Sequence, residues 1–274
     1  MSAGGEPITD VLDPCLADYR MAREADHRAQ GIFVAEGRFA VRQLLSGSRF
    51  AARSILTTEA MLQGLRDVLE CGPASIRVLV ASHEIIRAVV GFKFHRGCLA
   101  VGVRGAPVLP ATLIEPRGPR ALIVLERLVD PENVGAVFRN AMAFGIEGVL
   151  LSPGCGDPLA RKAIRASAGG SLRVPFAVVN DWPQGLGALG AADHVLVALT
   201  PAAAADLGDL GGAPLPARRA LLLGSEGYGL SPGSLALATI ARRIAMAPGV
   251  DSLNVATASG IALYELRRQL FSTM

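Results

Sequence analysis

The sequence predicts a two-domain α/β protein whose second domain is built on an open parallel sheet. Its 274 residues are enough for two separate hydrophobic cores. Short apolar runs alternate with helical patterns along most of the chain, which is typical of α/β proteins. A proline-rich stretch at residues 106–119 interrupts this pattern and separates a first domain at 1–105 from a second at 120–274.

The first predicted domain is small and mixes strands with helices. Its runs are, in order, GIFVAEG, FAVRQLL, SILTTE, AMLQGLRDVLE, IRVLVASHE, IIRAVV and CLAVGVR. The linker that follows contains Pro107, Pro110, Pro116 and Pro119. Because proline lacks a backbone N–H and fixes φ, we expect no regular structure over about a dozen residues there.

The second predicted domain contains six apolar runs. They are ALIVLE, GVLLS, VPFAVV, HVLVAL, ALLLG and RIAMA. These runs are apolar throughout, which is typical of a parallel sheet covered by helices on both faces. Ligands of such sheets bind beyond the carboxyl ends of the strands. The loops after these runs are therefore the predicted location of the functional site.

Composition excludes several classes of protein. The net charge of +3 allows a nucleic-acid partner without requiring one. The sequence has no CxxC pair, so it indicates neither a zinc site nor a disulfide framework, and we expect no metal. The start, MSAGGEPITDVLDP, lacks a secretory signal, and no apolar run approaches the ~20 residues of a membrane helix. We therefore expect a cytoplasmic protein that has no membrane segment.

Three loops at predicted strand ends carry polar residues. The first supplies Asn133 and the helix residue Arg139, the second Glu226, and the third Ser252 and Asn254. Each loop has a simpler explanation, namely a surface arginine, a tight glycine turn and helix capping. Polar loops at three separate strand ends are nevertheless more than turn formation requires, which favours one shared site.

The three loops together resemble the signature motifs of a known family. The segments DPENVGAVFRNAMAFG, LLLGSEGYGL and IAMAPGVDSLNVATA resemble, in order and spacing, the motifs of the SpoU family of RNA ribose methyltransferases, within the knotted SPOUT class. The intervening RKAIRASAGGSLRVPF extends the resemblance across residues 120 to 270. The first domain, through GIFVAEGRFAVRQLL and SILTTE, is more loosely similar to the RNA substrate-binding domain that often precedes this catalytic domain.

The resemblance implies a trefoil-knotted sheet, an S-adenosylmethionine cofactor, an RNA substrate (rRNA or tRNA) and a homodimer. The implied cofactor-binding residues are Leu199, Thr200, Gly224, Ile244, Met246 and Leu253. The implied catalytic group is Arg139, which acts on the ribose 2′-hydroxyl and reaches a cofactor bound by the partner subunit. Asn133, Glu226, Ser252 and Asn254 are implied to orient Arg139 and the ribose. Because arginine keeps its proton in proteins, we favour stabilisation of the alkoxide by charge over a literal general base.

Two other functions remain open at the level of sequence. One is a nicotinamide-dependent Rossmann enzyme, because Gly185, Gly187 and Gly190 form a GxGxxG pattern after VPFAVV, with Asp206 and Asp209 further on. Asp181, Trp182, Pro183 and Gln184 intervene before the glycines, whereas the fingerprint needs a tight turn directly off the strand. The other is a catalytically silent RNA-binding module, which the presence of Arg139, Glu226 and Asn254 argues against.

Two groups of basic residues are candidate phosphate contacts, although a solvated helix face would have the same composition. The second domain contributes Arg161, Lys162 and Arg165, and the first domain Arg20, Arg23, Arg28, Arg38 and Arg42. His27, His83 and His95 show no spacing typical of metal ligands.

Overall fold

A computed structural model describes residues 5–20, 24–72, 76–90, 97–115, 118, 120–209 and 217–271, with side chains described to residue 268. The chain forms two compact units, one comprising residues 1–106 with 159–173 and the other 107–158 with 174–274. The predicted limits differ from these units at residues 159–173, because helix α8 (Arg161–Ala166) packs on strand β2 (Ile32–Glu36) of the first unit. The division into an RNA substrate-binding domain at 1–105 and a methyltransferase domain at 120–274 stays a prediction.

The first unit is built on a five-stranded mixed sheet in the order β1-β4-β3-β5-β2. Its other strands are β1 (Glu6–Ile8), β3 (Ala51–Thr57), β4 (Arg77–Ala81) and β5 (Cys98–Val103). Strand β5 runs antiparallel to both β2 and β3, whereas β4 is parallel to β1 and β3. The accompanying helices are η1 (Pro14–Tyr19), α1 (Glu24–Ala29), α2 (Arg38–Leu45), α3 (Glu59–Gln63), α4 (Arg66–Glu70), α5 (His83–Val90) and α9 (Gly170–Arg173).

The second unit contains a six-stranded sheet in which every described pairing is parallel, in the order β11-β9-β10-β6-β7-β8. The strands are β6 (Arg120–Leu125), β7 (Gly148–Leu151), β8 (Phe176–Val178), β9 (Val195–Leu199), β10 (Arg218–Leu223) and β11 (Ile240–Arg242). Five of the predicted runs contain a strand. The sixth, RIAMA, does not, because pairing with β9 ends at Arg242 and the chain then leaves the sheet as a loop.

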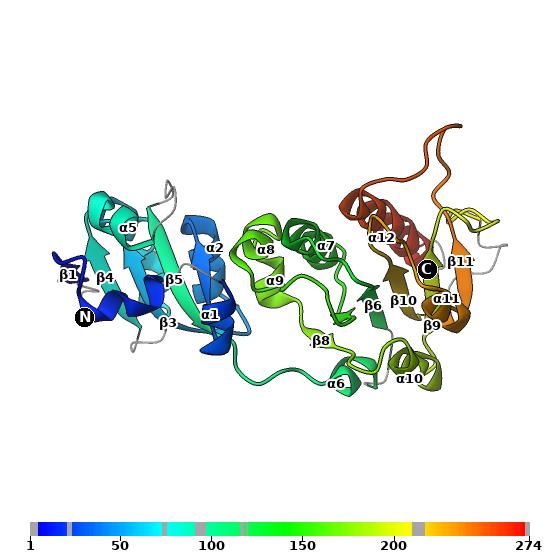
Figure 1. Cartoon of the computed structure of the whole chain (residues 1–274), viewed down its shortest axis with the longest axis horizontal. Coiled ribbons are helices and arrows are strands. Elements are labelled where there is room, and N and C mark those ends of the chain that lie inside the picture. Colours follow the sequence, from blue (N-terminus) through cyan, green and yellow to red (C-terminus); the bar gives the residue numbers. More distant parts are fainter. Residues whose placement is uncertain are drawn as a thin grey trace. The chain divides into compact units, whose positions relative to one another are not determined.

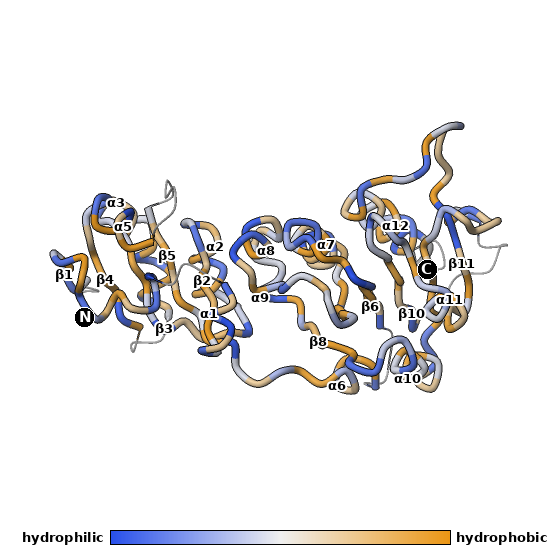
Figure 2. Tube along the Cα trace, viewed as in Figure 1, coloured by the Kyte–Doolittle hydropathy of each residue, from blue (hydrophilic) through white to orange (hydrophobic). Residues whose placement is uncertain are grey.

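Helices cover both faces of this second sheet. On one face α7 (Pro131–Ala143) lies beside α12 (Val255–Phe271), as Figure 1 shows, and both pack on a core that includes Val137, Phe138 and Leu263. The opposite face carries α6 (Pro110–Ile114), η2 (Gln184–Leu186), α10 (Gly187–Ala191) and α11 (Pro232–Leu237). The strands between these layers are mainly hydrophobic (Figure 2), as the apolar runs predict.

Helix α6 corrects the prediction that the linker at 106–119 has no regular structure. Pro110 occupies its first turn, where a missing N–H leaves no hydrogen bond unmade and the fixed φ suits a helix. Leu113 and Ile114 then bury their side chains against the sheet. Pro116 and Pro119 lie outside the described residues.

The described residues lack two kinds of feature, a membrane-spanning helix and a metal-binding cluster. Within the described ranges, no helix is both long and apolar enough to cross a membrane. The same part of the chain contains no cluster of three or more His, Cys, Asp or Glu side chains suited to a metal ion.

Candidate active site

The first motif forms a strand-end loop and the start of helix α7. The Asp130 side chain caps this helix by accepting a hydrogen bond from the Glu132 backbone N–H at 2.9 Å, and Pro131 occupies the first turn. The helix ends at Ala143, and Gly145 follows with φ of 68°, a conformation that glycine adopts without strain. Because the helix begins at Pro131, Asn133 lies in its first turn, beyond the carboxyl end of strand β6.

The three motif loops meet through their polar side chains. Asn133 donates from Nδ2 to the Glu226 carboxylate, and its Oδ1 accepts from Nδ2 of Asn254 at 3.0 Å. Asn254 also caps α12, because its Oδ1 accepts from the Ala256 backbone N–H at 2.9 Å. The structure therefore joins Asn133, Glu226 and Asn254, from three separate loops, in one hydrogen-bonded network.

The second motif is a tight loop that only glycine permits at its start. A Cβ atom on Gly224 would lie 2.3 Å from the backbone carbon of Gly229, so the strand end and the returning loop are in direct contact. The Gly229 N–H donates to the Ser225 carbonyl at 2.9 Å, and Gly229 has φ of 64°. Because no side chain separates these backbones, their peptide groups can approach a ligand closely.

A cavity of about 550 Å³ opens beside this loop, beyond the carboxyl ends of β9 and β10. All six predicted cofactor-binding residues line it, namely Leu199, Thr200, Gly224, Ile244, Met246 and Leu253. Glu226, Ser252 and Asn254 line it as well. A volume of this order with apolar walls and few polar groups suits a small-molecule ligand. The glycine cradle and apolar lining fit a nucleoside cofactor such as S-adenosylmethionine.

Arg139 lies apart from this cavity. It is exposed and is absent from the cavity lining, and its guanidinium makes no hydrogen bond or ion pair to the part of the chain that the structure describes. Arg139 lies six positions after Asn133, a displacement of about 9 Å along the helix and about 120° around it. The next residue, Asn140, faces α12 and donates to Ser259 Oγ at 2.8 Å. Within one chain, Arg139 and the predicted cofactor site are therefore not brought together.

Some residues around the site were not predicted from the sequence. Tyr228 lines the cavity with 86% of its surface exposed, and the Arg127 guanidinium lies 5.6 Å from the centre of its ring. Glu126 is buried behind the loop and accepts from Trp182 Nε1 and from the Ser231 backbone N–H, each at 3.1 Å. The sequence does contain a signal for Tyr228, because an aromatic side chain between two glycines of a loop is prominent. Nothing in the sequence distinguishes Glu126.

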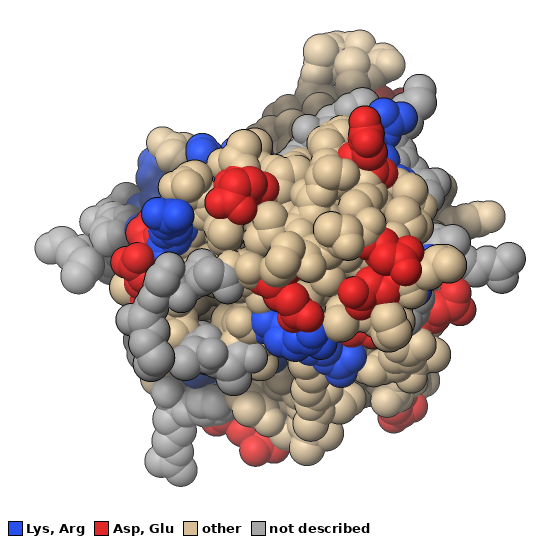
Figure 3. All heavy atoms as spheres, turned by 90° about the vertical axis from the view of Figure 1, so that its left-hand side faces the viewer, with Lys and Arg blue, Asp and Glu red and all other residues tan. Residues whose placement is uncertain are grey.

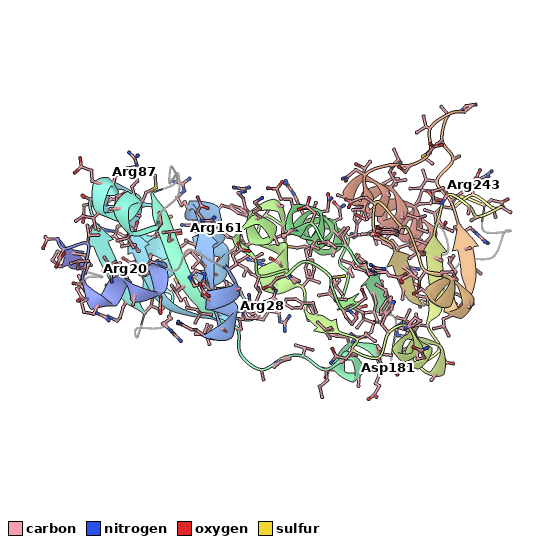
Figure 4. The ribbon with its side chains drawn as sticks, viewed as in Figure 1. Arg20, Arg28, Arg87, Arg161, Asp181 and Arg243 are labelled. Carbon is pink, nitrogen blue, oxygen red and sulfur yellow. The ribbon has the colours of Figure 1, made fainter. Side chains whose placement is uncertain are left out.

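The candidate basic patch of the first unit is largely committed to internal bonds. Arg20, drawn in Figure 4, donates to the backbone carbonyls of Val11 and Asp13. Arg42 forms a paired hydrogen bond with Asp67, both contacts at 2.6 Å, which lowers the pKa of that carboxyl to about 2. Figure 3 shows acidic and basic side chains interspersed on one face of this unit. Arg23 lies outside the described residues.

The glycines of the GxGxxG pattern do not form a dinucleotide site. They lie in η2 and α10, after the edge strand β8. A dinucleotide fingerprint instead lies where the strand order of a sheet reverses. None of these glycines lines the cavity beside Gly224.

Comparison with known proteins identifies the class to which this fold and cavity belong. Residues 120–264, over half of the chain, match the model of the SpoU rRNA Methylase family. An uncharacterized tRNA/rRNA methyltransferase of Mycobacterium tuberculosis is 37% identical, covering 96% of this chain and 92% of the relative. A 23S rRNA (guanosine-2′-O-)-methyltransferase, RlmB of Acinetobacter baylyi, is 32% identical, covering 76% of this chain and 85% of the relative.

Solved structures show the same fold. The AdoMet-bound rRNA methyltransferase of Sinorhizobium meliloti matches with a TM-score of 0.81 and 24% identity, covering 97% of this chain and 98% of that one. An RNA 2′-O ribose methyltransferase matches with a TM-score of 0.78 and 27% identity, covering 97% and 100%.

The chain belongs to the SpoU rRNA methylase family. The predicted family, the SPOUT-type α/β fold, the RNA methyltransferase activity and the S-adenosylmethionine cofactor are confirmed at the level of the family. After the edge strand β11 the chain returns to α12, which lies beside α7. The trefoil knot that the resemblance implies stays a prediction.

Proposed function

We propose that this chain transfers a methyl group from S-adenosylmethionine to a ribose 2′-hydroxyl of rRNA or tRNA, in the cytoplasm and as a homodimer. The observation that carries the proposal is the cavity beside Gly224, which is bordered by the hydrogen-bonded network of Asn133, Glu226 and Asn254. Membership of the SpoU rRNA methylase family supports the same reaction.

When bound, S-adenosylmethionine supplies a methyl group activated by its sulfonium. The glycine cradle at Gly224 and the walls from Leu199 to Leu253 hold and orient the cofactor, which lowers the entropic part of the barrier. A ribose hydroxyl is a weak nucleophile at neutral pH, so charge that develops on its oxygen must be stabilised. Arg139 supplies this positive charge, and the network around Asn133 fixes the carboxylate and amides that orient the ribose.

The exposed position of Arg139 supports a site shared between two subunits. Arg139 is exposed and does not line the cavity of its own chain, which supports a second copy bringing it there. An apolar face for such a copy exists on the neighbouring helix α12, where Ile261 and Tyr264 are 41% and 61% exposed, three residues apart. Leu253, at the cavity rim, is exposed as well.

The cofactor assignment is tested by calorimetry of the purified chain against S-adenosylmethionine, its demethylated product and NAD. We expect the first two to bind and NAD not to bind, because the glycines of the GxGxxG pattern lie away from the cavity. Transfer of labelled methyl groups to RNA then separates an enzyme from a silent RNA-binding module. Binding of NAD alone would refute the assignment. Binding of S-adenosylmethionine without methyl transfer to any RNA would contradict the enzyme and favour the silent RNA-binding module.

The dimer is tested on the full chain by light scattering at micromolar concentration. Charging the α12 face with Ile261→Glu and Tyr264→Glu together should give a monomer that no longer methylates RNA. The control is Leu237→Glu, which charges an exposed apolar side chain on α11 and should leave the dimer intact. A wild-type monomer with full activity would contradict the shared site.

A further inference from the structure

The second unit has another cavity, at the amino ends of its strands and so at the end of the sheet opposite to the cofactor cavity. This cavity has a volume of about 330 Å³ and lies at the amino ends of β6 and β10, whereas the cofactor cavity lies at the carboxyl end of β10. Its walls are mainly apolar and consist of Leu122, Phe144, Ile146, Leu221, Leu263 and Leu266. Its charged lining residues are Arg120, Arg219, Arg267 and Glu147. The proposed methyl transfer uses none of them.

Arg219 is a buried cation that faces this cavity. Alternate residues of a strand share one face, so Arg219 lies on the same side of β10 as Leu221, beneath α7 and α12. Arg219 is only 5% exposed, and its Nη1 has no hydrogen-bond partner among the described residues. Burial lowers the pKa of this guanidinium, and no carboxylate of the described residues offsets that effect. A buried charge is unfavourable unless it is paired.

The neighbouring charges do not supply the missing partner. The carboxylate of Glu147 accepts from the Ala121 backbone N–H at 2.8 Å, and no ion pair joins it to Arg219 in the described part of the chain. Arg267 is exposed, and its Nη1 donates to the Ala143 carbonyl at 3.4 Å. Arg120 also lines the cavity, but it is a cation and cannot pair with Arg219; its own Nε has no hydrogen-bond partner among the described residues.

We propose that this cavity binds a small organic monocarboxylate with an apolar body. The planar guanidinium of Arg219 would pair with the carboxylate through parallel N–H···O bonds. The leucine and phenylalanine walls would hold the apolar body, as in other small-molecule sites. The mainly apolar walls offer little to replace the water around a phosphate dianion, which favours an anion with a single charge. The site would be independent of the cofactor cavity and of the proposed reaction.

Calorimetry on the full-length protein tests the site with benzoate and hexanoate as probes. Hexanamide serves as the neutral control and phenyl phosphate as the dianionic one. We expect saturable binding of at least one carboxylate, and none of hexanamide. Arg219→Met should weaken carboxylate binding at least about tenfold and raise the Tm, because it keeps the packing volume and removes an unpaired buried charge. Arg268→Met is the matched control, since Arg268 is exposed on α12, is paired with Glu265 and does not line the cavity.

A second variant keeps the test decisive if Arg219→Met fails to fold. Ala217 is exposed and lines the cavity, so Ala217→Trp should obstruct the cavity and abolish carboxylate binding without disturbing the core. Absence of saturable carboxylate binding by the wild type would overturn the proposal, as would equal binding by Arg219→Met or by Ala217→Trp. Binding of phenyl phosphate alone would also overturn it. A lowered Tm in Arg219→Met, with no binding by the wild type, would mean that the chain itself supplies the partner of Arg219.

Discussion

Arg139→Ala is expected to bind S-adenosylmethionine within a few fold of the wild type and yet to methylate RNA at least about a hundredfold more slowly. Cofactor binding should persist because Arg139 is exposed and does not line the cavity beside Gly224. Catalysis should fail because positive charge near the ribose oxygen is needed only as the methyl group is transferred. A group used only in the transition state lowers kcat and kcat/KM together when it is removed.

Two measurements separate this role from RNA docking. Single-turnover transfer with saturating, prebound RNA reports the chemical step alone, and a near wild-type rate there would make Arg139 a docking residue. Arg139→Lys should restore little activity, because an ammonium keeps the charge but lacks the planar fork that engages ribose and phosphate together. Full rescue by lysine would argue for simple electrostatic attraction instead.

The sequence alone could predict the convergence of three motif loops. Asn133, Glu226 and Asn254 each follow or border a separate strand end, and the carboxyl ends of parallel strands meet at one edge of the sheet. The hydrogen bonds between them show that these three side chains lie together, and their roles in the reaction stay proposals. The cofactor residues follow from the same loops together with the family resemblance, and the cavity contains all six.

Other features depend on packing that periodicity does not encode. The apolar run RIAMA looks like a strand, but its Ile244 and Met246 line the cofactor cavity, because β11 pairs with β9 only as far as Arg242. Pro110 suggests irregular structure and instead begins a helix, since Leu113 and Ile114 have a core to bury into. Arg219 looks like any arginine at a strand start, and only the tertiary structure reveals its burial without a partner.

Gly224→Ala is expected to weaken S-adenosylmethionine binding at least about tenfold, which is at least about 1.4 kcal/mol. The added Cβ would lie 2.3 Å from the backbone carbon of Gly229 and 2.6 Å from the Leu230 nitrogen, so the loop that lines the cavity must move. The matched control is Gly227→Ala in the same loop, where an added Cβ has nothing within 4 Å and φ is not left-handed. Calorimetry, with thermal unfolding to verify folding, checks both variants. Equal affinity in Gly224→Ala and Gly227→Ala would contradict the cradle.

Mixing the two variants, at a cofactor concentration that saturates the wild type but leaves Gly224→Ala largely unbound and inactive, then tests whether the site is shared between subunits. A dimer of one Arg139→Ala chain and one Gly224→Ala chain has a single intact combination, the cavity of the first chain with Arg139 of the second. Random re-association of equal amounts should give about half mixed dimers, each with one working site of two, and hence about a quarter of wild-type activity. If Arg139 served the cavity of its own chain, every site in the mixture would lack one component, and the mixture would remain as inactive as its parts.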